Sequence, residues 1–194
     1  MVQLDKTKII STLKQTSKDD AGHAYLLSDM QEVYDFDEVS KQVSAQLRLG
    51  RQPRSCDALY IGEEYIYLLE FKNMKSGDLK KCKPELFEKA FDSVYQYILA
   101  YDNSVSLAEV TKKLRLIVVY NDAKGTTEVN TDISSSKSVD KIITTFKILS
   151  KKDGWDKYPK KFKLADKLEG KLFEKVITID VTNFNSLRDE IFKK

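Results

Sequence analysis

Apolar and polar positions alternate along two neighbouring runs in the first half of the chain. The runs CDALYI (56–61) and EYIYLLEFK (64–72) are rich in β-branched and aromatic residues, and Gly62 lies between them. Two such runs joined by a short glycine-containing turn are typical of a β-hairpin. We therefore expect a pair of antiparallel strands here.

The second of these strands carries charges on its apolar face. Ile66 and Leu68 point to one face, and Glu70 and Lys72 continue that face because side chains alternate along a strand. A carboxylate and an ammonium group at the end of a buried face are costly unless other groups compensate them. The pattern therefore predicts a site that needs these charges.

Helical spacing marks three further segments. Residues 5–16 and 23–47 carry apolar side chains at helical intervals, although 43–49 also alternates like a strand, so either element is open there. A helix that starts near Pro84 has one apolar stripe along its length. The stripe consists of Phe87, Ala90, Phe91, Val94, Tyr95 and Ile98.

The second half of the chain adds strands. LRLIVVY (114–120) is a continuous apolar run, which is typical of a strand covered on both faces. Two further strands are expected at 142–149 and 175–181, a polar loop at 125–138, and a terminal helix from Asn185. Together the elements predict an α/β fold with a mixed central β-sheet flanked by helices.

Length and composition predict a single globular domain. The chain has 194 residues, 41% hydrophobic and 32% charged, so we expect one domain over 1–194. No apolar run is long enough to cross a bilayer and the first residues are charged, so we expect a cytoplasmic protein without membrane contact. Cys56 and Cys82 lack the number and spacing of a disulfide framework and are expected to be free thiols.

Positive charge is concentrated in the C-terminal part of the chain. The net charge of +3 is small, but 137–194 forms a lysine-rich extension in which aromatic residues lie between the lysines. This composition predicts either a surface for a phosphate backbone or a solvated lysine-rich face beside a local core. The residues concerned are Lys137, Lys141, Lys147, Lys151, Lys152, Lys157, Lys160, Lys161, Lys163, Lys167 and Lys171, with Trp155, Tyr158 and Phe162.

Asp57, on the first strand of the predicted hairpin, is placed to approach Glu70. Two carboxylates at such a distance repel unless a cation lies between them. A divalent cation with oxygen ligands, Mg²⁺ or equally Mn²⁺, would supply that charge. Beside such a metal the pKa of Lys72 should fall, so its side chain could orient or deprotonate a water, or stabilise charge that develops at phosphorus.

Asp57, Glu70, Phe71 and Lys72, on a hairpin followed by an amphipathic helix and a buried strand, resemble the PD-(D/E)xK nuclease superfamily. The resemblance covers roughly residues 26–120 and implies a restriction-endonuclease-like core. It also implies that Asp57 and Glu70 bind Mg²⁺ and that Lys72 assists the attacking water.

Further family features fall on other residues. Many members carry a Glu on the helix before the hairpin, which makes Glu32 the candidate third metal ligand and Glu38 its competitor. Some members place a Gln, then a Tyr, on the helix after the hairpin; Gln96 and Tyr101 are similar, with one residue more between them than usual. Cys56 stands where the motif usually has Pro.

The sequence thus supports the hypothesis of a Mg²⁺-dependent nuclease acting on nucleic acid, with DNA favoured because most relatives by resemblance act on DNA. A homodimer is plausible because cleavage of both strands of a duplex often needs two sites. The alternative is a catalytically inactive nuclease-fold binding module, such as an immunity or assembly protein. Blander interpretations are a solvated Glu70–Lys72 pair of little energetic value, and a Gln96 that faces water.

Overall fold

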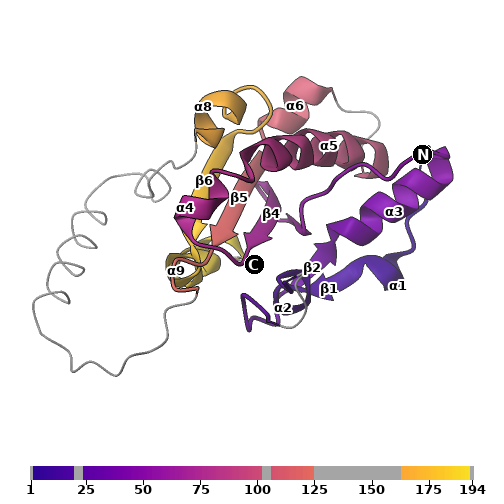
Figure 1. The fold of residues 1–194 in the computed structure, drawn as a ribbon. Helices are drawn as coiled ribbons and strands as arrows, with labels where there is room; N and C mark the ends of the chain where they lie inside the picture. Colours follow the sequence, from indigo (N-terminus) through magenta and orange to yellow (C-terminus); the bar gives the residue numbers. More distant parts are fainter. Residues whose placement is uncertain (1, 20–23, 102–105, 125–162, 193–194) are drawn as a thin grey trace, which may run out of the picture.

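The computed structural model describes residues 2–19, 24–101, 106–124 and 163–192 (Figure 1). They form a six-stranded mixed β-sheet with the strand order β1-β2-β3-β4-β5-β6. The strands are β1 (Ile10–Thr12), β2 (Glu32–Asp35), β3 (Ala58–Ile61), β4 (Ile66–Lys72), β5 (Leu114–Tyr120) and β6 (Lys175–Asp180). The helices are α1 (Lys6–Ile9), α2 (Leu13–Thr16), α3 (Phe36–Leu47), α4 (Ser76–Leu79), α5 (Lys83–Tyr101), α6 (Leu107–Thr111), α8 (Leu164–Leu168) and α9 (Val181–Ile191).

The predicted hairpin and buried strand are confirmed. β3 pairs with β4 in antiparallel register, and β4 pairs with β5 in parallel register, with Glu70 opposite Val118 and Lys72 opposite Tyr120. Gly62 starts the turn, where its N–H donates to the Tyr65 carbonyl at 3.0 Å. An α/β fold with a mixed central sheet is therefore present, as the sequence predicts.

The N-terminal part of the chain differs from the expected helices. The segment 5–16 is divided because β1 lies between α1 and α2 and pairs with β2. Among the described residues 24–47 only α3 is helical, and the Asp35 carboxylate caps it by accepting the Glu38 N–H at 3.0 Å. Pairing with β1 and β3 makes β2 a strand, an effect that local helical spacing does not reveal. The ambiguous 43–49 is helical as far as Leu47.

Helix α5 is confirmed, but its buried face is rotated from the predicted stripe. Phe91 and Tyr95 are more than half exposed, whereas Leu86 and Tyr97 are buried. The face of α5 that packs on the sheet carries both apolar and polar side chains. Its polar side chains Lys89, Ser93 and Gln96 form hydrogen bonds with β4 and with the segment that precedes β3. At the C-terminus, α9 begins at Val181 with Asp180 as its cap, four residues before the expected start at Asn185.

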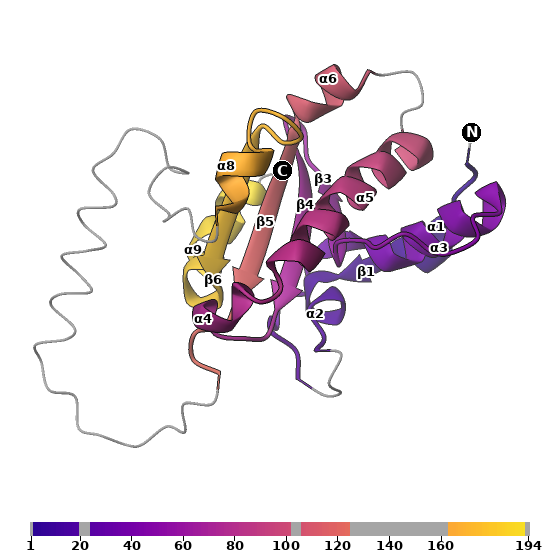
Figure 2. The same cartoon turned by 45° about the horizontal axis from the view of Figure 1, so that its top comes forward.

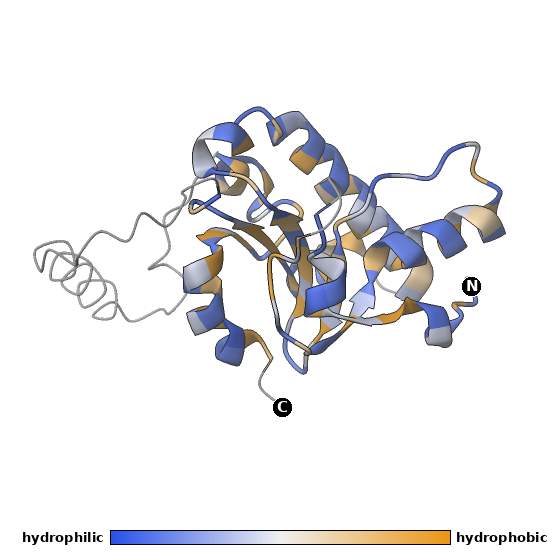
Figure 3. Cartoon of the chain, turned by 60° about the horizontal axis from the view of Figure 1, so that its bottom comes forward, coloured by the Kyte–Doolittle hydropathy of each residue, from blue (hydrophilic) through white to orange (hydrophobic). Residues whose placement is uncertain are grey.

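Two apolar cores lie on the two faces of the sheet, with α5 over one face and α9 over the other (Figure 2) and apolar strands at the centre of the fold (Figure 3). On one face, Leu68 and Leu116 pack with Ala90 and Val94 of α5. On the other face, the core contains residues of α2 and α9, including Leu13, Phe184 and Leu187. Because Glu70 follows Leu68 on the α5 face, its carboxylate lies at the edge of the first core.

Several sequence expectations lie outside the described residues. They are the loop at 125–138, the strand at 142–149, and the lysines and aromatic residues from Lys137 to Phe162. The described part of the extension contributes α8, β6 and α9, and β6 joins the sheet beside β5. Within the described segments, every helix is too short or too polar to span a lipid bilayer.

Candidate functional site

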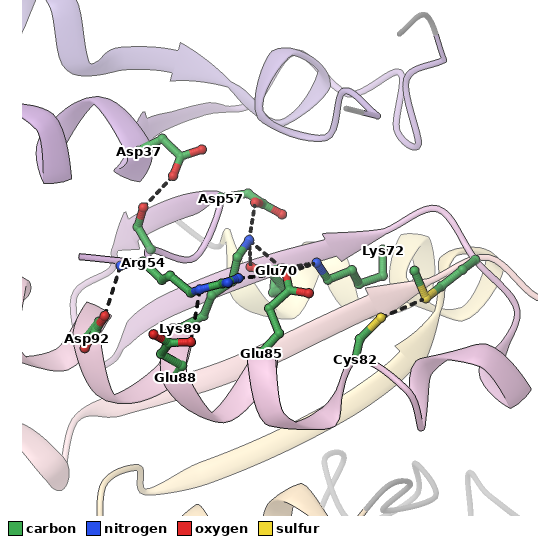
Figure 4. Close-up of polar contacts among 12 residues, drawn as sticks. Asp37, Arg54, Asp57, Glu70, Lys72, Cys82, Glu85, Glu88, Lys89 and Asp92 are labelled. Atoms are coloured by element: carbon green, nitrogen blue, oxygen red, sulfur yellow. Dashed lines mark hydrogen bonds and ion pairs between the residues drawn. The ribbon is translucent and has the colours of Figure 1, made fainter. Parts of the chain in front are cut away.

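Asp57, Glu70 and Lys72 meet at one end of the sheet, beneath α5 (Figure 4). Asp57 directly precedes β3, and its own N–H donates to the Leu69 carbonyl at 3.0 Å. Its Oδ2 accepts the Phe71 N–H at 2.6 Å, which fixes the carboxylate beside the end of β4. The hairpin therefore brings together the three residues that the sequence motif singles out.

A second lysine, Lys89 of α5, lies between the two carboxylates. Its Nζ is 2.8 Å and 3.0 Å from the two oxygens of Glu70 and 3.3 Å from Oδ1 of Asp57. Lys72 Nζ is 3.0 Å from Glu70 Oε1 and 2.9 Å from Oε1 of Glu85, also on α5. Glu70 thus accepts from both ammonium groups, and Asp57 accepts only from Lys89 among these lysines.

Burial explains the electrostatics of these carboxylates. Glu70 is only 1% exposed, and burial raises its pKa although Lys89 and Lys72 oppose the rise. Burial, followed by repulsion from Glu70, raises the pKa of Asp57 well above its usual value. The two carboxylates therefore need positive charge close by in order to stay ionised together.

The protein's own groups hold the pKa of Lys72 above its usual value, and the fall expected beside a metal stays a prediction. Burial alone would lower this pKa, but the Glu70 carboxylate, helped by a hydrogen bond to Glu85, raises it. The pKa of Lys89 is raised in the same way, because burial acts to lower it and the charges of Glu70 and Asp57 outweigh burial. The protein's own groups keep both side chains as cations.

The carboxylates fit a small divalent cation. Their oxygens surround one point, now marked by Lys89 Nζ, and Mg²⁺ commonly takes one or two carboxylates together with waters and substrate phosphate. Within the described segments no group of three or more His, Cys, Asp or Glu side chains could hold a metal. Asp57 and Glu70 fall short of such a group, so a metal bound between them would need water or substrate oxygens as further ligands.

Helix α5 also holds the backbone that leads into Asp57. Asp92 accepts the Arg54 N–H at 2.9 Å, and Gln96 Nε2 donates to the Arg54 carbonyl at 2.8 Å. The Ser93 hydroxyl accepts the N–H of Cys56 at 2.8 Å. Pro lacks this N–H, so the departure from the usual motif at Cys56 supplies a hydrogen bond that the fold uses.

Gln96 is buried rather than solvated, and its hydrogen bond is to the backbone before Asp57 rather than to the carboxylate of Asp57 or Glu70. Its contact is with the Arg54 backbone, and its Oε1 is buried without a hydrogen-bond partner among the described residues. Tyr101 stacks on Tyr97 at 5.4 Å between ring centroids, and its hydroxyl likewise lacks a partner in the described part of the chain. Gln96 thus contacts the backbone that leads to Asp57, and Tyr101 packs on Tyr97.

The structure does not bring Glu32 to the site. Glu32 is exposed on β2 opposite Thr12, three residues before Asp35, which pairs beside Asp57. At about 3.3 Å per residue, roughly 10 Å of strand separates Glu32 from that position. The expectation that Glu32 lies on a helix is wrong because residues 32–35 form β2, and its assignment as a metal ligand stays a prediction.

The competitor, Glu38, is no better placed. It lies in the first turn of α3 and its carboxylate pairs with Lys41 at 3.3 Å. Asp37, its neighbour, accepts a hydrogen bond from the Ser55 hydroxyl and adds to the raised pKa of Asp57, which burial mainly causes. Asp37 is therefore the acidic residue of α3 that bears on the site.

A cavity of about 150 Å³ opens beside the carboxylates. Its lining includes Asp57, Lys72 and Lys89 together with Lys18, Asn73 and Lys124. Asp19 also belongs to this lining, where its carboxylate accepts from the Asn73 amide at 2.8 Å and lies 3.8 Å from Lys124 Nζ. The cavity is polar and carries several cationic side chains, so it suits an anionic group.

Two site residues escaped prediction from the sequence, Glu85 and Lys89. Both lie on α5, and together with Gln96 they repeat at helical spacing along one side of the helix. A polar stripe of this kind on a helix that packs on a sheet could have indicated them. Ala90 and Val94 of the predicted apolar stripe are buried, whereas its Phe91 and Tyr95 are exposed, so the buried face of α5 is turned toward the polar stripe.

Comparison of the chain with protein-family models, curated proteins and solved structures gave no match. The geometry of Asp57, Glu70, Lys72 and Lys89 is therefore the basis for a functional assignment.

Proposed function

We propose that the protein is a metal-dependent nuclease of the PD-(D/E)xK type, with a restriction-endonuclease-like core, that hydrolyses phosphodiester bonds of DNA. The observation that carries the proposal is the convergence of Asp57 and Glu70: oxygens of both lie within 3.3 Å of a single cationic nitrogen. A bare pair of charges on a solvated hairpin would not be buried or held in this way.

The order of elements around the site supports the same proposal. An antiparallel hairpin carries Asp57, Glu70 and Lys72, α5 crosses it, and β5 returns parallel to β4. This is the order expected from the motif. It places the charged end of the hairpin at one end of the central strands of the sheet.

The proposed roles follow from the contacts. Asp57 and Glu70 would hold Mg²⁺ or Mn²⁺, which acts as a Lewis acid and lowers the pKa of a bound water. Lys72 is kept cationic by Glu70 and Glu85, so it would orient the water and stabilise charge at phosphorus rather than take up a proton.

The charges around the site suit a phosphodiester. Asp57, Glu70 and Glu85 face the ammonium groups of Lys72 and Lys89, and Glu85 also lies 3.8 Å from the Arg54 guanidinium, so the protein's own charges nearly balance. A divalent cation would add two positive charges, which suits an anionic phosphodiester. The cavity beside the carboxylates would receive the neighbouring phosphate.

The test is cleavage of plasmid, linear duplex DNA, single-stranded DNA and RNA with Mg²⁺ or Mn²⁺. The wild type is compared with Glu70→Gln and Lys72→Met, and unfolding curves confirm that the variants are folded. Glu63→Gln and Lys112→Met are matched controls, because both are exposed residues near the opposite end of the hairpin and of β5. We expect metal-dependent cleavage that both site variants lose and both controls keep.

The proposal would be overturned if Glu70→Gln and Lys72→Met both still cleave, or if the wild type cleaves in the presence of a chelator. Sedimentation of the active protein addresses the homodimer, which would supply two such sites to the two strands of a duplex. A monomer that nicks only one strand would contradict the homodimer prediction and would still be consistent with the nuclease proposal.

One observation favours a second function, a binding module that retains a nuclease-like fold, such as an immunity or assembly protein. The carboxylates of Asp57 and Glu70 already face two ammonium groups, those of Lys89 and Lys72, so their charges are balanced without a metal. A folded wild type that neither binds Mn²⁺ nor cleaves any substrate would support the binding module.

A further inference from the structure

Lys89 occupies the point at which the proposed metal would bind. Its Nζ contacts both oxygens of Glu70 and one of Asp57, at 2.8 to 3.3 Å. Lys72, by contrast, joins Glu70 to Glu85. The two lysines therefore have different tasks, and Lys89 is the one that bridges the two proposed metal ligands.

We infer that Lys89 is an exchangeable counter-ion of the site: its ammonium group holds Asp57 and Glu70 together until a divalent cation takes its place. The inference rests on the proposed function. It adds that the Lys89 ammonium group holds Asp57 and Glu70 in the arrangement that the metal requires. The two carboxylates would then need little rearrangement when the metal enters.

Ion size and charge favour the exchange. A Mg²⁺ ion lies about 2.0–2.1 Å from its oxygen ligands and carries two charges, whereas the ammonium group carries one at a longer distance. Both cations cannot share the same point. Binding of the metal must therefore move Lys89 Nζ away from the carboxylates.

The structure gives Lys89 room to move. Its side chain is 16% exposed and lines the cavity of about 150 Å³, and its four-carbon stem is flexible. Glu70, at 1% exposure, is fixed in the core edge. Metal entry would therefore displace the lysine toward the cavity and leave the carboxylate in place.

The displaced ammonium group would then face the position proposed for a substrate phosphate. When the metal binds, the Lys89 ammonium group would become available to pair with the anionic substrate. Metal binding and phosphate binding are expected to favour one another, because each is coupled to the same movement of Lys89.

The test measures Mn²⁺ binding by titration calorimetry and thermal melting, in the absence of nucleic acid. We expect Lys89→Met, which removes the competing charge, to bind Mn²⁺ about tenfold or more tightly than the wild type. Without metal it should melt at a lower temperature than the wild type. Mn²⁺ should raise its melting temperature back toward that of the wild type. Lys89→Gln, also uncharged but able to donate a hydrogen bond, repeats the test if Lys89→Met does not fold.

Two control variants separate competition from a general change in charge. Lys89→Arg keeps a cation on the carboxylates and should bind Mn²⁺ no more tightly than the wild type. Lys18→Met removes a lysine that lines the cavity away from the Asp57–Lys89–Glu70 contacts, and should change the affinity less than about threefold.

The outcomes distinguish the inference from the proposed function. If the wild type binds Mn²⁺ and Lys89→Met or Lys89→Gln binds it equally or more weakly, Lys89 is not a competitor and the inference is overturned while the nuclease proposal stands. If neither the wild type nor the Lys89 variants bind Mn²⁺, the metal site itself fails and the inference fails with it.

Discussion

The Lys89 ammonium group lies 2.8 Å from Glu70 Oε1, although the two residues come from a helix and a strand that are 19 positions apart in the chain. This contact explains why a buried strand face can end in a carboxylate. Glu70 is desolvated, so its ionised form depends on cations that the fold supplies. If the proposed metal site holds, the same contact makes stability and metal binding compete at one point.

Replacement of Asp57 by Asn should stabilise the protein at neutral pH while it abolishes cleavage. Burial and repulsion from Glu70 raise the pKa of Asp57, so keeping it ionised in the folded state costs free energy above the ordinary carboxyl range. The amide introduced by the substitution would still offer a carbonyl oxygen to the Phe71 N–H. We expect Asp57→Asn to raise the free energy of unfolding at pH 7 by about 1 kcal/mol or more.

The pH dependence has a definite sign. Because the folded-state pKa of Asp57 is raised, the wild type loses stability as pH rises from about 4, the ordinary carboxyl pKa, toward that raised value. The stability advantage of Asp57→Asn should therefore grow as pH rises above about 4 and vanish below it. Urea unfolding between pH 3 and 8 measures this. A variant that is less stable than wild type at every pH would show that the carboxylate contributes net stability.

Introduction of the proline that the motif usually carries should harm this protein. Cys56→Pro removes the N–H that donates to Ser93 and leaves a buried hydroxyl without its donor, at a cost of about 1–3 kcal/mol in the free energy of unfolding. Cys56→Ala keeps the N–H and should cost less. In a Ser93→Ala background the penalty of Cys56→Pro should shrink, and an equal penalty in both backgrounds would rule out the hydrogen bond as its cause.

Gln96 should act on cleavage through the Arg54 backbone. Gln96→Met removes the donor to the Arg54 carbonyl, three residues before Asp57, and should cost about 1 kcal/mol of stability. We expect kcat to fall about tenfold or more with KM little changed, because a misplaced Asp57 affects the reacting geometry more than substrate binding.

The matched control for Gln96 is its exposed neighbour Tyr95. Tyr95→Ala should leave stability and kcat close to those of the wild type, since the ring is 58% exposed. An equal loss in both variants would point to general weakening of α5 rather than to positioning of Asp57.

Arg188 should stabilise the fold in a pH-dependent way. It pairs with both oxygens of Asp29, which joins α9 to the segment before β2. Partial burial acts to raise the pKa of Asp29, but Arg188 and the Gln31 N–H lower it below its usual value. Arg188→Ala should therefore cost about 1 kcal/mol at pH 7.

The cost should fade in acid. A lowered folded-state pKa contributes stability that is present above the ordinary carboxyl range and is lost as pH falls below about 4. Thermal melting from pH 7 to pH 2.5 checks this, with Asp189→Asn as the control because Asp189 is 80% exposed beside the same arginine. A penalty that is independent of pH would assign the effect to packing of the arginine stem.

Local patterns were sufficient for the hairpin at β3 and β4, for the existence of α5 and for the buried β5. Their signals come from residues next to one another in the chain: alternation, helical spacing and a continuous apolar run. The motif residues Asp57, Glu70 and Lys72 belong to this group, because the hairpin alone brings them together. The sequence by itself therefore determined the core of the sheet and three residues of the candidate site.

Tertiary structure decided the remainder. β1 and β2 are strands because each pairs with a strand distant in the chain, which also places Glu32 away from the site. Lys89 and Glu85 reach the carboxylates because α5 packs across the hairpin in one particular rotation, which depends on both partners at once. The polar stripe of Glu85, Lys89 and Gln96 indicates that side of α5, but only the packing of the helix on the hairpin places Lys89 between Asp57 and Glu70.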